Sequence, residues 1–189
     1  MKNIVIFASG SGTNAENIMI HFQNSAFAKV VAVFCNNENA KVIDKTKKRT
    51  VATEIFSKND LNEGLVLEKL KDYRPHLIVL AGFLLKFPTA IIAEFPNKII
   101  NIHPALLPKY GGKGMYGLKV HQSVLENNEA ETGITIHFVN EHYDEGEFIF
   151  QKSINIEDCV SADEIAKKIN ELEMECFPTT IEKMLKNQP

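Results

Sequence analysis

The chain has 189 residues, of which 44% are hydrophobic and 24% charged, and its net charge is −3. This composition is typical of an ordinary globular protein, so we expect residues 1–189 to form a single domain. The slightly acidic charge argues against a nucleic-acid partner, the absence of a long apolar run argues against a membrane span, and the first residues lack the features of a signal peptide. Three scattered cysteines favour reduced thiols and a cytoplasmic protein.

The first predicted unit is a strand, a glycine-rich turn and a helix. An apolar run at 3–8 predicts a buried parallel strand, and a helix is expected at 15–22. The Ser-Gly-Ser-Gly-Thr-Asn turn at 9–14 would present backbone N–H groups to an anion, with side-chain help from Thr13 and Asn14. Because the third glycine of a dinucleotide fingerprint is missing, one phosphate fits better than a pyrophosphate. The alternative is a plain tight turn in which Asn14 caps the helix.

Strands and helices then alternate. Strands are predicted at 29–34, 50–56, 76–81 and 98–102, and helices at 40–48, 60–73 and 88–95. In the helix at 60–73, the leucines at 61, 65, 67 and 70 are expected to face the core. The alternation predicts an α/β, Rossmann-like three-layer sandwich with a mostly parallel sheet. Ligands on such sheets bind at the carboxyl ends of strands, so the turns after residues 8, 81 and 102 should share one edge.

The last third of the chain predicts an antiparallel part of the sheet. A strand is expected at 132–139 and its partner at 147–156, joined by an acidic loop, with a short helix before them at 119–127. A glycine-rich loop at 108–118 is either a mobile lid or a plain surface connection. Ser161-Ala-Asp-Glu reads as a capping box that opens the last helix, and Pro178 is expected to kink or briefly break that helix.

Two polar residues end the strand at 98–102. Asn101 and His103 stand two positions apart, so an extended chain places both side chains on one face. An amide and an imidazole held at a strand end suit a carbonyl oxygen that becomes negative during a reaction. The alternative is a turn asparagine and a buried, hydrogen-bonded histidine. His137 and Asp144 could join them as an acid–base pair, whereas the spacing of these residues does not favour a metal site.

Several segments carry a resemblance to a known family. They are Ser9 to Asn14, Leu80-Ala81-Gly82-Phe83, the run Asn-Ile-His-Pro-Ala-Leu-Leu-Pro-Lys-Tyr at 101–110, and Gly133 to Val139 with Asp144-Glu145-Gly146. Together they resemble the phosphoribosylglycinamide formyltransferases, over residues 3 to about 184. The resemblance implies transfer of the formyl group of 10-formyltetrahydrofolate to the amine of glycinamide ribonucleotide in purine (IMP) synthesis. It also implies no metal and a monomer or weak homodimer.

The resemblance assigns roles to particular residues. In the catalytic trio, Asn101 would hold the formyl oxygen, His103 would donate a proton to the tetrahedral oxyanion, and Asp144 would raise the pKa of His103. The ribonucleotide would be held by Gly12, Thr13, Asn14 and Glu173. The folate would contact Leu84, Leu85, Lys86, Phe87, Asn101, His137, Val139 and Asn140.

The chain also departs from the pattern of the family. Many relatives have Met-Arg where this chain has Leu84-Leu85, and only Lys58 is a candidate for the folate tail. Methionyl-tRNA formyltransferase, a relative, would need an RNA-binding barrel after the last helix, and formyltetrahydrofolate hydrolase a regulatory domain before the first strand. We therefore expect the ribonucleotide enzyme, with the hydrolase or another formyltransferase of the family as alternatives. A non-catalytic nucleotide-binding module is the alternative from another class, and it would not depend on the catalytic trio.

Overall fold

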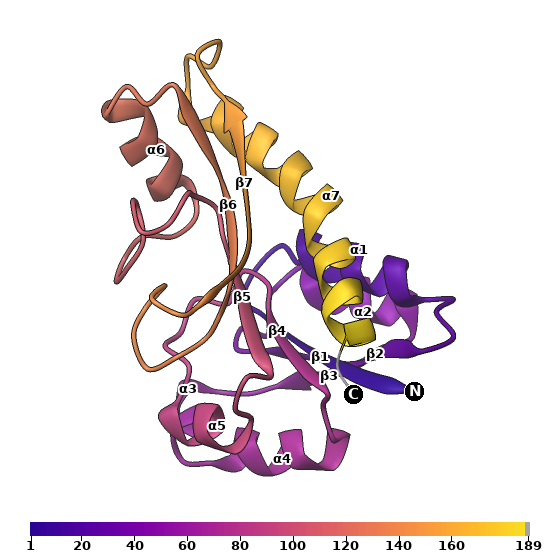
Figure 1. Ribbon diagram of the computed structural model, residues 1–189. Helices are drawn as coiled ribbons and strands as arrows, with labels where there is room; N and C mark the ends of the chain where they lie inside the picture. The colour runs from indigo at the N-terminus through magenta and orange to yellow at the C-terminus, as the bar shows by residue number, and fades with distance from the viewer. Residues whose placement is uncertain (188–189) are drawn as a thin grey trace.

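A seven-stranded mixed sheet forms the centre of the computed structural model, which describes residues 1–187 (Figure 1). The strands are β1 (Lys2–Ala8), β2 (Ala28–Cys35), β3 (Ala52–Ile55), β4 (Leu77–Leu80), β5 (Ile99–His103), β6 (Glu131–Phe138) and β7 (Phe148–Asn155). Their order across the sheet is β3-β2-β1-β4-β5-β6-β7. The pairs from β3 to β5 are parallel, and β6 pairs antiparallel with both β5 and β7. The predicted Rossmann-like sheet with an antiparallel C-terminal part is confirmed.

Helices cover both faces of this sheet. They are α1 (Thr13–Phe22), α2 (Val42–Arg49), α3 (Lys58–Asn62), α4 (Leu65–Tyr73), α5 (Thr89–Glu94), α6 (Leu118–Glu126) and α7 (Ala162–Asn187). In Figure 1, α3, α4 and α5 lie on the opposite side of the sheet from α1, α2 and α7. Among the helices of residues 1–187, none combines the length and the apolar character needed to cross a membrane.

The strand β1 shows why its sequence is continuously apolar. Ile4 and Ile6 belong to the core beneath α1 and α7, whereas Val5 and Phe7 belong to the core beneath α4 and α5. Successive side chains of a strand point to opposite faces, so a strand covered on both faces needs apolar residues at every position.

Aromatic rings fix the chain where β4 ends. The Phe7 ring centroid lies 5.0 Å from that of Phe34, 5.8 Å from Phe56, 5.3 Å from Phe83 and 5.0 Å from Phe87. Edge-to-face and stacked contacts of this kind add to the free energy of simple burial. Because Phe83 and Phe87 flank the segment that follows β4, these contacts anchor that segment at both ends.

The single helix predicted at 60–73 was wrong, because the chain forms α3 and α4 instead. Gly64 lies between them with φ 90°, a left-handed conformation that favours glycine and ends the first helix. The break turns Leu65 outward, where it is 55% exposed, although it was expected in the core. Val66 and Leu70 are buried in its place.

Of the kink or brief break predicted at Pro178, the break was wrong, since α7 runs through this residue. Proline has no N–H to offer the carbonyl four residues earlier, which here belongs to Met174. Asn17 of α1 donates its Nδ2 to that carbonyl over 2.7 Å. The helix continues because a second helix supplies the missing donor.

Two helix starts differ in detail from the expectation. Ser161 Oγ accepts from the N–H of Glu164, but the Glu164 carboxylate accepts from the N–H of Val160, so the capping box is only half formed. Pro88 precedes α5 as its N-cap residue instead of lying in the first turn.

Candidate active site

A cavity of about 780 Å³ opens at the carboxyl ends of β1, β4 and β5. The turns after these strands therefore do share one edge, as predicted. The cavity brings together every residue that was placed in the catalytic trio, the ribonucleotide site or the walls of the folate site: Gly12, Thr13, Asn14, Leu84, Leu85, Lys86, Phe87, Asn101, His103, His137, Val139, Asn140, Asp144 and Glu173. Lys58 does not line it. The volume is in the range of small-molecule binding sites.

The loop after β1 begins α1 without any side-chain cap. Gly12 is the N-cap residue at φ 67°, and a Cβ there would lie 2.4 Å from Cγ2 of Val42. Val42 also donates its N–H to the carbonyl of Gly10 over 3.2 Å, so α2 fixes the loop. The alternative in which Asn14 caps the helix is wrong. The first turn of α1 leaves N–H groups at the cavity, where they suit an anion.

Asn14 turns instead to α7, where its Nδ2 donates to Oε2 of Glu173 over 2.8 Å. Burial raises the pKa of the Glu173 carboxyl to about 7, although the hydrogen bond from Asn14 opposes this effect. Oδ1 of Asn14 is buried and has no partner among the described residues. A carboxyl group that titrates near neutral pH thus lies beside the loop after β1.

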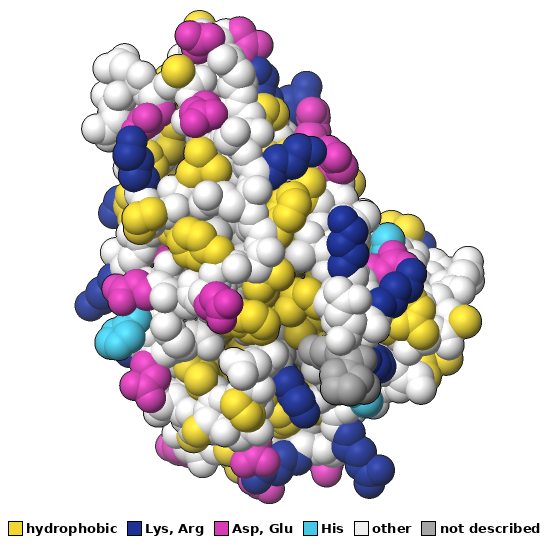
Figure 2. Space-filling model, viewed as in Figure 1, with side chains coloured by type: hydrophobic (Ala, Val, Ile, Leu, Met, Phe, Trp, Pro, Cys, Tyr) yellow, Lys and Arg dark blue, Asp and Glu magenta, His cyan; other side chains and the backbone are white. Residues whose placement is uncertain are grey.

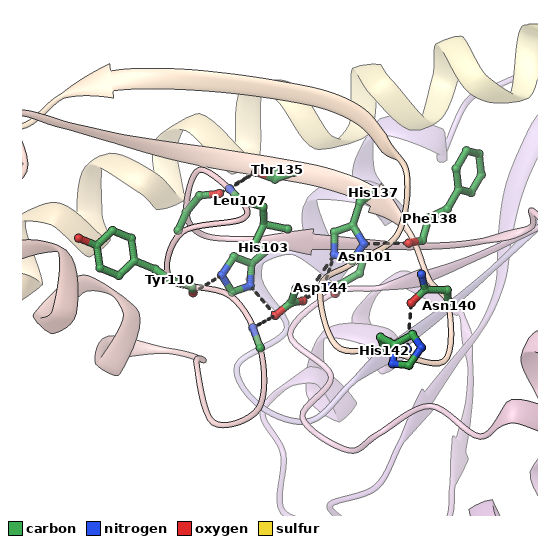
Figure 3. Close-up of polar contacts among 12 residues, drawn as sticks. Asn101, His103, Leu107, Tyr110, Thr135, His137, Phe138, Asn140, His142 and Asp144 are labelled. Atoms are coloured by element: carbon green, nitrogen blue, oxygen red, sulfur yellow. Dashed lines mark hydrogen bonds and ion pairs between the residues drawn. The ribbon is translucent and has the colours of Figure 1, made fainter.

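His103 is held at the end of β5 with both ring nitrogens engaged (Figure 3). Nε2 lies 2.8 Å from the carbonyl oxygen of Tyr110, and because a carbonyl can only accept, Nε2 carries a hydrogen. Nδ1 lies 3.5 Å from Oδ2 of Asp144. Nδ1 is therefore the nitrogen that gains and loses a proton.

The pKa of His103 is set by opposing effects. Burial is the largest and lowers the pKa, whereas the charge of Asp144 and the carbonyl of Tyr110 raise it, and the net pKa lies below the ordinary value. Asp144 thus raises the pKa of His103 as predicted, but burial lowers that pKa by more.

Asp144 is positioned by a tight loop. Its backbone lies at φ 58°, and its Oδ2 accepts the N–H of Gly112 over 2.9 Å. Two residues later, a Cβ on Gly146 would come within 1.6 Å of the carbonyl oxygen of Phe138, so the loop can return to the sheet only with glycine there. Burial raises the pKa of Asp144, but His137, the charge of His103 and the Gly112 N–H together hold it below the ordinary value.

Asn101 is oriented by His137, its antiparallel partner across β5 and β6. Nδ1 of His137 lies 2.8 Å from the carbonyl oxygen of Phe138 and so carries a hydrogen. Nε2 lies 3.5 Å from Oδ1 of Asp144 and, when the ring is neutral, accepts from Nδ2 of Asn101 at 3.2 Å. The second hydrogen of that Nδ2 points toward Oδ1 of Asp144 over a long 3.5 Å (Figure 3). His137 therefore fixes which way the amide faces.

The remaining walls are apolar or mixed. Nζ of Lys86, in the segment after β4, lies 5.9 Å from the centroid of the Tyr143 ring in the loop after β6. Residues 112–118 form a further wall and are tied to Asp144 through Gly112. Because this glycine-rich loop lines the cavity, it is not the plain surface connection that was one of its two interpretations.

Sequence reasoning missed His121, which also lines the cavity. It is 5% exposed, and its Nδ1 is buried without a partner among residues 1–187. Burial, helped by the charge of His103, lowers the pKa of His121 to about 4, so its ring is neutral near pH 7. The available signal was its place beside Val120 and three residues before Val124 on the buried face of α6.

The arrangement can stabilise an oxyanion and move a proton. The Asn101 amide and Nδ1 of His103 are donors beside one carboxylate at a buried strand end, which are the parts that such chemistry requires. Within residues 1–187, no cluster of three or more His, Cys, Asp or Glu side chains is placed to hold a metal ion.

Comparison with known proteins gives this site a family. Residues 2–181 match the sequence model described as formyl transferase. The chloroplastic phosphoribosylglycinamide formyltransferase of Arabidopsis thaliana is 34% identical over 175 residues, which cover 89% of this chain and 60% of that protein. This chain thus spans about 60% of the length of that plant relative and of a second one from Vigna unguiculata.

Bacterial relatives match over more of their length. The phosphoribosylglycinamide formyltransferase of Escherichia coli (strain K12) is 30% identical over 185 residues, covering 95% of this chain and 85% of that protein. The crystal structure of glycinamide ribonucleotide transformylase 1 from Geobacillus kaustophilus superposes with a TM-score of 0.89 at 31% identity, covering 98% of this chain and 99% of that one. The chain belongs to the formyl transferase family.

Proposed function

We propose that this protein transfers the formyl group of 10-formyltetrahydrofolate to the amine of glycinamide ribonucleotide, a step of purine (IMP) biosynthesis. The observation that carries the proposal is the meeting of Asn101, His103 and Asp144 in a cavity that the loop after β1 also lines. The names of the relatives supply the acceptor and the transferred formyl group, and the resemblance to the family supplies 10-formyltetrahydrofolate as the donor. Both are substrates and neither is a resident cofactor.

The two substrates would divide the cavity between them. The ribonucleotide phosphate suits the uncapped start of α1 at Gly12, Thr13 and Asn14, and the sugar hydroxyls suit the carboxyl of Glu173. The folate ring suits the more apolar side formed by residues 84–87 and 139–140 together with His137. The amine and the formyl carbon then meet at the ends of β5 and β6.

The reaction follows from the hydrogen-bonding state of the trio. As the substrate amine attacks the formyl carbon, the formyl oxygen becomes an oxyanion. Nδ2 of Asn101 donates to it with the hydrogen that otherwise points over the long 3.5 Å to Asp144, and the protonated Nδ1 of His103 is the second donor. Asp144 stabilises the imidazolium and receives the proton that the amine gives up. The oxyanion then re-forms a carbonyl as the bond from carbon to the folate N10 breaks, and N10 leaves with the proton that Asp144 received from the amine.

Two relatives offer competing acceptors, namely tRNA and water. A tRNA needs an extended basic surface. The face in Figure 2 instead mixes Lys and Arg with Asp and Glu side chains. A hydrolase would admit water where the amine should lie. The proposal therefore includes no nucleic-acid partner. It also includes no membrane partner, a single formyltransferase domain, a cytoplasmic location, and a monomer or weak homodimer.

Acceptor dependence tests the proposal. Loss of 10-formyltetrahydrofolate, followed by absorbance, should require glycinamide ribonucleotide and should yield the formylated ribonucleotide. Methionyl-tRNA should accept no formyl group, and without acceptor only slow hydrolysis should occur. Rapid formate release that ignores added ribonucleotide would replace this proposal with the hydrolase.

A further inference from the structure

Ser9 lies between the two halves of the cavity without lining it. It follows the last residue of β1 and begins the turn that leads to the anion-binding loop, and it is 7% exposed. Its backbone N–H donates to the carbonyl of Gly82 over 3.1 Å, just after β4. The residue therefore joins the ends of two neighbouring strands before its side chain is considered.

The hydroxyl of Ser9 makes two further bonds. It donates to Oδ1 of Asn36, after β2, over 2.6 Å, and it accepts the N–H of Leu84 over 3.0 Å. The single hydroxyl hydrogen is committed to Asn36, so a lone pair is directed at Leu84. Asn36 thus sets the rotation of the hydroxyl, and the hydroxyl sets the position of the Leu84 backbone.

We propose that Ser9 is a positioning residue for the folate half of the cavity, although its sequence position belongs to the ribonucleotide loop. The inference rests on the proposed function. Leu84 opens the wall segment 84–87, and its N–H is held by Ser9 Oγ. The anion-binding loop has separate supports, because the N–H of Val42 holds the carbonyl of Gly10 and the N–H of Glu16 holds that of Gly12.

Removing the hydroxyl should therefore affect the two substrates unequally. In Ser9→Ala, the N–H of Leu84 loses its partner while the Phe83 ring still packs against Phe7. The Phe83 ring therefore still anchors the start of the turn, whereas the backbone at Leu84 is free to shift. We expect the KM and the calorimetric Kd for 10-formyltetrahydrofolate to rise by up to about 10-fold, the effect of one lost, partly buried hydrogen bond, and the KM for the ribonucleotide to change less than about twofold.

Asn36→Ala supplies a second, independent test. It should raise the folate KM about threefold in the wild-type background and add nothing when Ser9 is already alanine, because Asn36 acts only through the hydroxyl. Ser25→Ala is the matched control. Its hydroxyl accepts the N–H groups of Phe27 and Ala28 at the start of β2, away from the cavity, and its loss should move neither KM.

The outcomes separate the two proposals. If the unaltered protein transfers no formyl group to glycinamide ribonucleotide, the proposed function fails. If the unaltered protein is active but Ser9→Ala and Asn36→Ala leave the folate KM unchanged, or raise both KM values equally, the positioning role of Ser9 is refuted. Should Ser9→Ala fail to fold, the selective rise in folate KM must still appear in Asn36→Ala, and its absence there is decisive.

Discussion

Two backbone carbonyls decide how the histidines of the site hold their protons. The carbonyl of Tyr110 fixes a hydrogen on Nε2 of His103, and that of Phe138 fixes one on Nδ1 of His137. The consequences differ, because His103 is left with Nδ1 facing Asp144 whereas His137 is left with an acceptor for Asn101. Two histidines on paired strands are thus suited to different tasks, His103 to exchanging a proton and His137 to orienting an amide.

Asp144→Asn tests the pairing at residue scale. Removing the carboxylate charge takes away an effect that raises the pKa of His103, so that pKa should fall further below its ordinary value. In the proposed mechanism the protonated ring is the donor, so the loss of turnover toward high pH should begin at lower pH in the variant. Turnover at its optimum should drop about 100-fold, the usual loss when an acid–base or oxyanion group is removed. A pH–rate profile that keeps its position and height would remove Asp144 from the mechanism.

Glu173 makes a prediction about stability. Its pKa is about 7 in the folded protein and 4.5 in the reference state, so the folded protein holds the proton more tightly. Stability from this group is fully present below the unfolded pKa and is lost as pH rises through the folded one. Relative to Glu173→Gln, the wild type should lose about 3 kcal/mol of unfolding free energy between about pH 4 and pH 8, from the size of the pKa shift.

Denaturant unfolding of both proteins across this pH range measures the difference, and groups common to both cancel. A difference that stays flat with pH, or that grows in favour of the wild type as pH rises, contradicts the raised pKa of Glu173.

At the scale of elements, α1 and α7 are joined by two asparagines on one face of α1. Asn14 donates to the Glu173 carboxyl and Asn17 to the carbonyl of Met174. Residues three apart on a helix are neighbours, so the two bonds act on adjacent residues of α7. The pair fixes the Glu173 side of the cavity, and it also makes Pro178 tolerable inside a helix.

Asn17→Ala should expose that second role. The carbonyl of Met174 would lose its donor, and because the bond is largely exposed we expect a loss of about 0.5–1 kcal/mol in unfolding free energy. In Pro178→Ala, the new N–H at 178 can bond the same carbonyl, so Asn17→Ala should then lose clearly less. A double-mutant cycle by denaturant unfolding measures the coupling. Equal losses in both backgrounds would show that Asn17 does not replace the missing N–H.

At the scale of the molecule, the parts that follow from local pattern were predictable. The apolar runs of β1 and β4, and the spacing of Asn101 and His103, reflect strand geometry alone, and the sheet and the shared edge follow from them. The effects of Pro178 and Gly64 on their helices were misjudged for different reasons. The partner that rescues the helix at Pro178 lies 157 residues from Met174, and a lone glycine in a helical pattern does not say whether the helix continues.

The site shows the same division between local and distant causes. Residue types and their order led to the proposed trio, because amide, imidazole and carboxylate are chemically distinctive, and the structure brings these three side chains together. Burial was not visible, so the sequence could not show that it outweighs Asp144 in setting the pKa of His103, or that it raises the pKa of Glu173. His121 escaped for a related reason, since a histidine on an apolar helix face signals only burial.

The most direct measurement is the turnover of formyl transfer from 10-formyltetrahydrofolate to glycinamide ribonucleotide by His103→Ala, Asn101→Ala and the control His21→Ala. His21 pairs with Glu182 outside the cavity, so the His21→Ala variant should keep full activity. The two site variants should each lose about 10²–10³ in kcat, the usual effect of one oxyanion donor, while still binding both substrates in calorimetry. Near-normal kcat in both site variants would show that the chemistry takes place without this pair and would contradict the account.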